Sequence, residues 1–220
     1  MNFSLDFALS ILPRILSTFT TTLLVTIAGC LGAALLGFVW EIARRSSKIG
    51  HYVMRFLIDF FRSTPLLVQI YFLYFVLPEY GITLSALVVG VMALSLYYSG
   101  YLAEVFKGGI NSIPKGQFEA AKALGLSRFQ LILLVIAPQM LRNIAAPMGN
   151  YFVSLLKATP YLAIIAVPEM LSIALEVASE TFRYTEPMTV VGAIFLSLAL
   201  CFSALVKVIE TRLRLSPKAG

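Results

Sequence analysis

Charged residues are scarce in this chain of 220 residues. Asp, Glu, Lys and Arg together make up 13% of it, whereas hydrophobic residues make up 59% and the mean hydropathy is +0.88. A water-soluble fold of this length has too little interior to bury so much apolar surface. The composition therefore excludes an ordinary soluble protein and predicts that lipid surrounds much of the chain.

Residues that bind metals or form disulfides are also rare, with two Cys and one His. Cys30 and Cys201 both lie inside apolar stretches, where we expect small buried side chains and no disulfide. His51 lies among basic residues beside a predicted membrane boundary, and no metal site can be argued from it. Because the sequence shows no clustered His, Cys or carboxylate ligands and no nucleophile motif, a membrane enzyme is not favoured.

Long uncharged stretches divide the chain into membrane-spanning segments. A membrane helix needs about 20 mostly apolar residues, and five segments reach this length once a few flanking charges are included. The predicted spans are 14–42, 52–78, 81–106, 143–175 and 187–210. They predict an all-α integral membrane protein with one transmembrane domain over residues 1–220.

The positions of the charges predict an orientation in the membrane. Basic residues follow the first, third and fifth spans, as Arg44, Lys122 and Arg212 illustrate, whereas the connection after the fourth span holds Glu176 and Glu180. Cytoplasmic loops carry an excess of Lys and Arg. We therefore expect an extracytoplasmic N-terminus and a cytoplasmic C-terminus, and no nucleic-acid partner despite the net charge of +6.

The longest hydrophilic connection lies between the third and fourth predicted spans. Pro114 follows polar residues and is typical of a helix start, while Gly125 suits a left-handed helix stop. Ser127 and Gln130 form a capping-box pattern that restarts a helix. The segment therefore predicts a short helix over about 114–124, a glycine turn and a second helix.

The predicted short helix has one apolar face. Phe118, Ala121 and Leu124 recur at helical spacing, and charged residues occupy the remainder. A helix of this length is too short to cross a membrane, but it suits docking. We therefore expect this face to enter a hydrophobic groove on a partner.

Several motifs together resemble one protein family. Glu119, Ala120 and Ala121, followed after three residues by Gly125 and after nine more by the segment 135–138, resemble the cytoplasmic EAA signature of permease subunits in ABC importers. Val and Ala stand at positions 135 and 137, where the signature usually has Ile and Leu. Three further segments resemble the polar-amino-acid branch of that family, and they span residues 62–69, 108–110 and 113–117.

The resemblance implies a type I ABC importer permease fold with about five transmembrane helices and a cytoplasmic coupling helix in the bacterial inner membrane. It also implies three partners: a second permease, identical or homologous, an extracytoplasmic solute-binding protein, and a dimeric ATPase that holds ATP and Mg²⁺. The chain itself has no G-x-x-x-x-G-K-S/T phosphate loop, so we expect no cofactor in it. The implied coupling residues are Gln117, Glu119, Ala120, Ala121, Leu124 and Gly125.

Polar residues within the spans mark a candidate substrate pathway. Tyr97, Tyr101 and Glu104 share one helical face, and Pro160 interrupts the fourth span and frees a backbone carbonyl. In the resembling family these regions face the pathway, although packed tyrosines, a simple proline kink and pairing of Glu104 with Lys107 remain alternatives. The candidate pathway residues are Gln69, Tyr97, Tyr98, Tyr101, Lys157, Ala158, Thr159 and Pro160.

The substrate class follows from the same residues. Many members of the resembling family have an acidic residue where Ala158 stands, so a strongly cationic side chain is not favoured. Tyrosine rings attract delocalised cations, and the segments 182–188 and 72–81 resemble ectoine permeases. We therefore expect a polar amino acid, basic ones included, or a related zwitterion such as ectoine. The alternative is an ion-coupled secondary transporter that uses Glu104 or Glu169.

Overall fold

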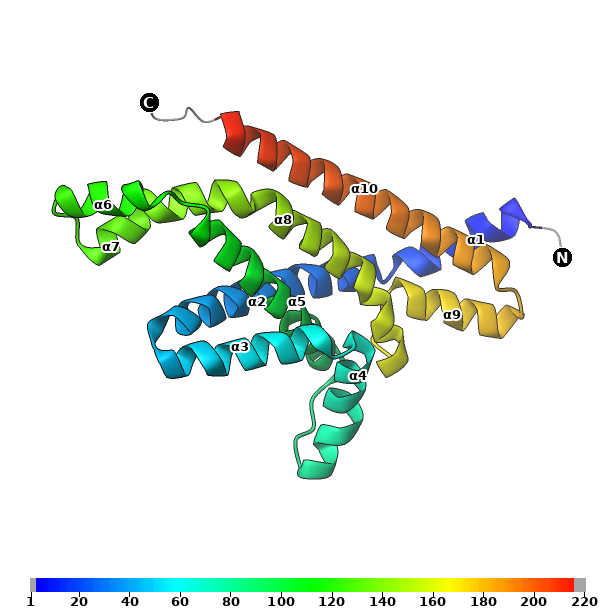
Figure 1. The fold of residues 1–220 in the computed structure, drawn as a ribbon. Coiled ribbons are helices and arrows are strands. Elements are labelled where there is room, and N and C mark those ends of the chain that lie inside the picture. Colours follow the sequence, from blue (N-terminus) through cyan, green and yellow to red (C-terminus); the bar gives the residue numbers. More distant parts are fainter. Residues whose placement is uncertain (1–2, 216–220) are drawn as a thin grey trace.

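The computed structural model describes residues 3–215, and these residues form helices with no strand among them (Figure 1). The remaining positions of the predicted 1–220 domain lie outside the described residues. In chain order the elements are α1 (Leu5–Leu16), α2 (Phe19–Ser46), α3 (Lys48–Ser63), α4 (Leu66–Tyr71), the π-helix η1 (Phe72–Val76), the 3₁₀-helix η2 (Leu77–Tyr80), α5 (Ala86–Asn111), α6 (Lys115–Ala123), α7 (Arg128–Gln130), the π-helix η3 (Leu131–Ile136), α8 (Ala137–Ala158), the 3₁₀-helix η4 (Thr159–Ile165), α9 (Met170–Thr181) and α10 (Thr185–Leu215). The predicted all-α class is confirmed.

Four helical segments within residues 3–215 are long and apolar enough to cross a membrane: α2, α5, Leu131–Ile165 and Thr185–Leu213. A fifth candidate combines Lys48–Ser63 with Leu66–Tyr80, which meet at an angle of 102°. The predicted span over 52–78 falls on this bent pair and stays a prediction. Pro65 begins α4 with extended backbone and disfavours continuation of α3 through Thr64, which explains the break.

The first and fourth spans also differ from their predicted bounds. The prediction 14–42 runs across the boundary between α1 and α2, because Arg14 belongs to α1, where its side chain binds Glu176 and Glu180 of α9. The prediction 143–175 joins α8 to α9, which the structure separates. Ala166 adopts a left-handed φ of 56° after η4, and the chain turns there before α9 begins.

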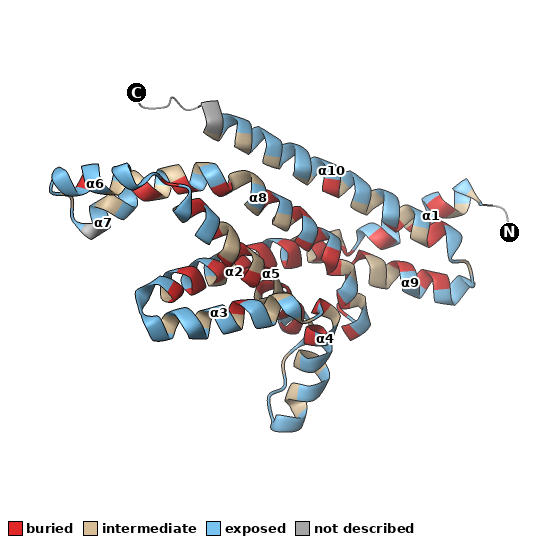
Figure 2. Ribbon diagram, in the orientation of Figure 1, coloured by how far each residue is buried: buried red, intermediate tan, exposed pale blue. Residues whose placement is uncertain are grey.

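Small residues allow α2 and α5 to approach closely. A Cβ atom at Gly37 would lie 2.8 Å from the carbonyl oxygen of Ser99, and one at Gly32 would lie 2.3 Å from Oγ of Ser95. Such contacts are characteristic of membrane helices that pack through small side chains. Buried positions accordingly concentrate along α2 and α5, whereas α10 and α6 are mostly exposed (Figure 2). We call this contact the α2–α5 seam.

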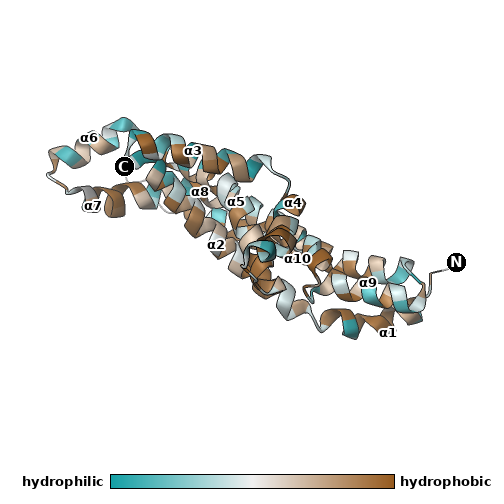
Figure 3. Cartoon of the chain, turned by 90° about the horizontal axis from the view of Figure 1, so that it is seen from below, coloured by the Kyte–Doolittle hydropathy of each residue, from teal (hydrophilic) through white to brown (hydrophobic). Residues whose placement is uncertain are grey.

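The two ends of the helical bundle are formed by different helices. α1, α9 and the start of α10 meet at one end, the α9 end, and pack around Ile15, Met170 and Val177. α6, α7 and the connection between α2 and α3 lie toward the opposite end, the α6 end (Figure 1). Hydrophilic positions recur on α6 and α3, and hydrophobic ones dominate the middle of the bundle (Figure 3).

The two cysteines behave differently from each other. Both thiols are free, Cys30 is buried in the main core and Cys201 is exposed on α10. The prediction of a small buried side chain is therefore confirmed for Cys30 and wrong for Cys201. The exposed thiol belongs to the apolar outer face of α10, which lipid is expected to cover.

Candidate functional site

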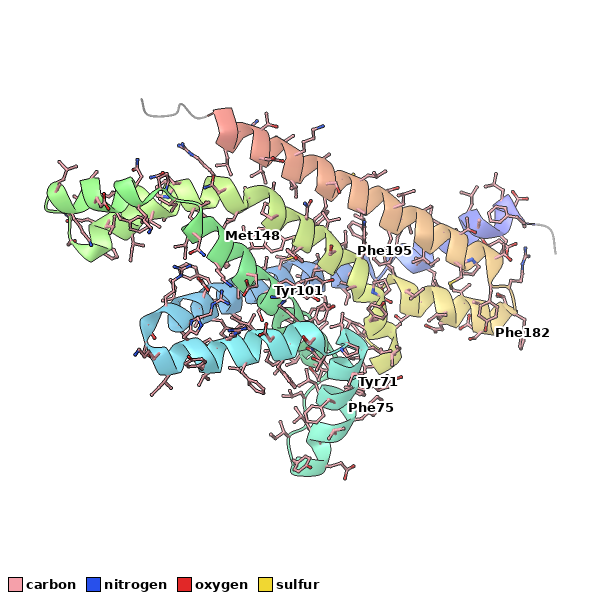
Figure 4. The ribbon with its side chains drawn as sticks, in the orientation of Figure 1. Tyr71, Phe75, Tyr101, Met148, Phe182 and Phe195 are labelled. Carbon is pink, nitrogen blue, oxygen red and sulfur yellow. The ribbon has the colours of Figure 1, made fainter. Side chains whose placement is uncertain are left out.

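Three tyrosines of α5 form the centre of the candidate pathway site. The hydroxyl groups of Tyr97 and Tyr101 lie 3.2 Å apart, and the rings of Tyr97 and Tyr98 meet edge to face with 5.1 Å between their centroids. Tyr151 of α8 approaches Tyr101 with a centroid distance of 5.3 Å. Figure 4 shows Tyr101 at the middle of the bundle. The helical spacing of the tyrosines on α5 thus produces a real cluster, which a second helix completes.

Arg62 connects this tyrosine cluster to the end of α3. Its guanidinium carbon lies 5.5 Å from the centroid of the Tyr101 ring, and the Tyr101 hydroxyl donates a hydrogen bond of 3.2 Å to the Arg62 carbonyl oxygen. A cation over a tyrosine face is attracted by the ring quadrupole. The cluster therefore combines aromatic faces, hydroxyl groups and a neighbouring positive charge, a set of groups suited to a zwitterionic solute.

Glu104 is held by several cations at the α6 end of α5. Its carboxylate accepts hydrogen bonds from Arg44 at 2.5 Å and from Lys107 at 3.2 Å, and it lies 4.0 Å from Arg62. Arg44 also pairs with Glu41, and both of these side chains are buried. The expected pairing of Glu104 with Lys107 is confirmed, but it is one part of a larger ionic network.

The predicted pathway residues around Pro160 differ in how far they are buried. Ala158 and Thr159 are buried, and the Thr159 hydroxyl donates to the Leu156 carbonyl oxygen at 2.9 Å. Pro160 lies at the start of η4, where the chain tightens from an α-helix to a 3₁₀-helix. The proline therefore changes the helix type as well as its direction.

Lys157 does not join the tyrosine cluster. Its side chain is exposed and lines a cavity of about 240 Å³ beside α10, together with Phe195 and Ser203. Figure 4 places Phe195 on α10, across from α8. The structure thus separates Lys157 from Tyr97 and Tyr101, with which the sequence analysis grouped it.

Gln69 stabilises the break between α3 and α4. Its amide nitrogen donates to the carbonyl oxygens of Phe61 at 2.9 Å and Thr64 at 3.2 Å, and to the Thr64 hydroxyl at 2.7 Å. Carbonyl groups at the end of a helix lack intrahelical donors, so the amide supplies the missing hydrogen bonds. The amide oxygen is buried and has no partner among the described residues. A pathway role for Gln69 remains a prediction.

The predicted short helix is α6, Lys115–Ala123, at the α6 end of the bundle. Gln117, Glu119, Ala120 and Leu124 are exposed, and Leu124 is 79% exposed. Ala121 is only 3% exposed, and Phe118 packs against the main core. In the single chain the apolar side chains of Phe118 and Ala121 attach α6 to the rest of the bundle, which leaves Leu124 as the exposed apolar residue of the predicted docking face. The docking role of this face stays a prediction.

The turn after α6 follows its sequence signals closely. Gly125 has a left-handed φ of 71°, which L side chains rarely adopt. Beyond it, the Ser127 amide donates to Oε1 of Gln130 at 2.9 Å, and the Gln130 amide donates to Oγ of Ser127 at 3.3 Å. This reciprocal pair is a capping box. Gly125 and the capping box therefore fix the turn between α6 and α7.

Three parts of the site were not predicted from the sequence: Tyr151, Arg62 and the Arg44–Glu41 pair. Contacts between α5 and α8 join residues 50 positions apart, and no periodicity within one helix predicts them. A buried arginine of α2 was also unexpected, since Arg44 reads as one of several basic residues after a span. The segment 62–69 carried a signal, because it opens with Arg62 and ends with Gln69.

Comparison with known proteins places this architecture in a family. The model of the family "Binding-protein-dependent transport system inner membrane component" matches residues 33–215. A probable amino-acid ABC transporter permease protein, y4tG of Sinorhizobium fredii, is 40% identical over 220 residues, which cover 100% of this chain and 94% of that protein. The arginine transport system permease protein ArtQ of Bacillus subtilis is 30% identical over 96% of this chain and 98% of its own length.

Solved structures agree with the sequence comparisons. An amino acid ABC transporter crystallised with histidines superposes with a TM-score of 0.89 at 32% identity, covering 96% of this chain and all of that one. An inward-facing MetNI methionine ABC transporter shares the fold with a TM-score of 0.73 at 16% identity, covering 96% and 99%. The all-α bundle, the exposed α6 with its glycine turn and these matches together show that the chain belongs to the inner-membrane permease components of binding-protein-dependent ABC importers, in the amino-acid branch with the type I fold.

Proposed function

We propose that this chain forms half of a gated pathway that carries a polar amino acid or a related zwitterion into the cytoplasm. A second permease, identical or homologous, supplies the other half, and an extracytoplasmic solute-binding protein delivers the solute. ATP and Mg²⁺ bind to a dimeric ATPase on separate chains. The α9 end then faces the extracytoplasmic side, and the α6 end, with the C-terminal end of α10, faces the cytoplasm.

The exposed surface of α6 carries this proposal. Glu119, Ala120 and Leu124 are accessible at the end of the bundle, while Ala121 attaches the same helix to the core. A helix with one side fixed and the other open transmits movement from a partner to the helices beside it. Gly125 and the capping box after it keep the orientation of α6 constant during that movement.

The tyrosine cluster supports the proposed substrate class. Tyr97 and Tyr101 offer hydroxyl groups and ring faces, and Ala158 adds no carboxylate to that region. A relative at 30% identity is named for arginine transport, and a putative permease at 32% identity, from Rickettsia typhi, is named for glutamine transport. Amino acids of both kinds, and ectoine, therefore belong in the first uptake competition.

Uptake by proteoliposomes that contain the permease, its ATPase and its binding protein tests the proposal. Uptake that requires ATP on the ATPase side and survives a protonophore supports it. Uptake that continues without ATP and collapses with the protonophore favours the ion-coupled alternative. Glu104 is held in an ionic network with Arg44 and Lys107, which disfavours a role in proton coupling, so Glu169 is the carboxylate to replace in that case.

A further inference from the structure

A polar cavity at the α6 end adjoins the tyrosine cluster, and Arg62 contributes to both. It has a volume of about 330 Å³, and α2, α3 and α5 contribute its walls. Four cationic side chains and two carboxylates line it together with one histidine: Arg44, Arg55, Arg62, Lys107, Asp59, Glu104 and His51. With the histidine neutral, the lining carries a surplus of two positive charges.

The carboxylates of the cavity are already committed to particular cations. Glu104 contacts Arg44, Arg62 and Lys107. Arg44 also pairs with the buried Glu41, but Glu41 pairs with Arg45 as well, so adding these two residues leaves the surplus of two positive charges unchanged. Asp59 lies 3.8 Å from Arg55 of the same helix. Arg44 is buried, with its side chain 6% exposed. The remaining positive charge attracts anions to the cavity.

The surface of α3 beside the cavity is apolar. His51, Arg55, Asp59 and Arg62 recur along one side of α3 at intervals of three or four residues. Phe56, one residue after Arg55, is 68% exposed, and Phe60, one residue after Asp59, is 48% exposed. A charged stripe and an apolar stripe therefore run side by side along the first part of the predicted span 52–78.

We propose that this cavity binds the phosphate group of an anionic phospholipid. Basic cavities between membrane helices bind lipid headgroups, and cationic side chains there attract anionic lipids. Arg55 and Lys107 supply exposed charge to the phosphate, and the acyl chains lie along Phe56 and Phe60. The apolar stripe favours a lipid over a soluble anion, because a soluble anion would make no use of it. This inference does not depend on the transported solute or on the ATPase.

Native mass spectrometry of the purified full-length permease tests the site. The protein is equilibrated in detergent with equal amounts of phosphatidylglycerol and phosphatidylcholine, and the lipid adducts are counted. We expect preferential retention of phosphatidylglycerol by the unmodified chain. In the double variant Arg55→Gln with Lys107→Gln we expect the affinity to fall about thirtyfold, since each basic residue near a membrane surface contributes about 1 kcal/mol.

Two further variants separate a lipid site from general charge effects and from misfolding. Lys207→Gln with Arg212→Gln removes the same charge from exposed positions of α10 and should leave phosphatidylglycerol retention unchanged. Arg55→Lys with Lys107→Arg keeps the charge and should retain the lipid. An equal loss of phosphatidylglycerol in the variant Lys207→Gln with Arg212→Gln would overturn the proposal. Full retention in the variant Arg55→Gln with Lys107→Gln would overturn it as well.

A competition experiment identifies the source of the anion. Inorganic phosphate and glycerol 3-phosphate are added at millimolar concentration to the lipid-loaded permease. The proposal requires that phosphatidylglycerol stays bound, because the acyl chains add apolar contacts that the free anions lack. Complete displacement by either soluble anion would show that the cavity is a site for soluble anions and would overturn the lipid assignment.

Discussion

Small residues occur both in the α2–α5 seam and on α6, but for different physical reasons. In the seam, a Cβ at Gly37 would meet backbone atoms of α5 at 2.8–2.9 Å. At Gly116 and Gly125, a Cβ would meet no atom within 4 Å, and Ala120 is exposed. The seam needs small residues for its own packing, whereas the positive φ explains Gly125 alone. The packing of the chain itself gives no reason for a small residue at 120, and contact with the proposed ATPase would supply one.

The largest effect on stability is expected from a bulky residue in the seam. Gly37→Leu places side-chain atoms where backbone atoms of Ser99 and Ala103 already lie, and overpacking of this kind costs about 3 kcal/mol. Thermal unfolding in detergent measures the loss. The matched control Gly192→Leu lies on α10 with open space around its Cβ. If the two variants unfolded at the same temperature, the seam would not be the rigid part of the molecule.

The next effect concerns the ionic network at the end of the seam. Glu104→Gln removes the carboxylate that Arg44, Arg62 and Lys107 share. The buried Arg44 then keeps only its partner Glu41, and a weakened buried charge pair costs about 2 kcal/mol. Chemical denaturation compares this variant with Glu79→Gln, at an exposed position of η2. A loss no greater than that of the control would mean that α2 and α5 are held by apolar packing alone.

A smaller effect on stability is expected at the turn after α6. Gly125→Ala forces an L side chain into a left-handed φ of 71°, which costs about 1 kcal/mol. The space around the Cβ is open, so strain is the sole cause. Gly116→Ala lies on α6 in equally open space with helical backbone, and it should cost nothing. We expect the loss of ATP-dependent uptake in Gly125→Ala to be larger than the loss of stability alone would cause, because the direction of α6 changes.

The smallest effect concerns the ion pair between α1 and α9. The hydrogen bond from Arg14 lowers the pKa of the Glu180 carboxyl below its ordinary value, and both side chains are about half exposed. A lowered pKa contributes stability above the unfolded-state value near 4.5, and that contribution disappears as the pH falls through the lowered pKa. Unfolding temperatures of the unmodified chain and Glu180→Gln should therefore differ slightly at pH 7 and converge in acid. A difference in unfolding temperature that grew as the pH fell would contradict this prediction.

The sequence predicted the features that depend on local chemistry. Gly125, the Ser127–Gln130 capping box and the apolar length of α2 and α5 all follow from neighbouring residues, and the structure confirms each of them. The placement of Lys157 and Ala121 could not be predicted in this way. Which side of a helix meets its own chain depends on how the other helices pack, and a helical periodicity gives a face without naming its neighbour.

The bounds of the spans show the same limit. Pro65 is a local signal for a break, yet the angle of 102° between the two parts depends on how α4 packs against the rest of the bundle. Figure 4 shows Tyr71 and Phe75 on the arm that projects after this break. Both rings are exposed in the single chain. The direction of such an arm is set by contacts that hydropathy does not record.

The most direct test of the account measures whether the ATPase binds to α6 at Ala120. Ala120→Trp should change the free energy of unfolding by no more than about 0.5 kcal/mol, as most surface substitutions do, because position 120 is exposed. Co-purification of the ATPase with this variant is then compared with co-purification by the unmodified permease. We expect the variant permease to remain folded and the ATPase no longer to co-purify with it. Retention of the ATPase at the original ratio, with uptake intact, would contradict it.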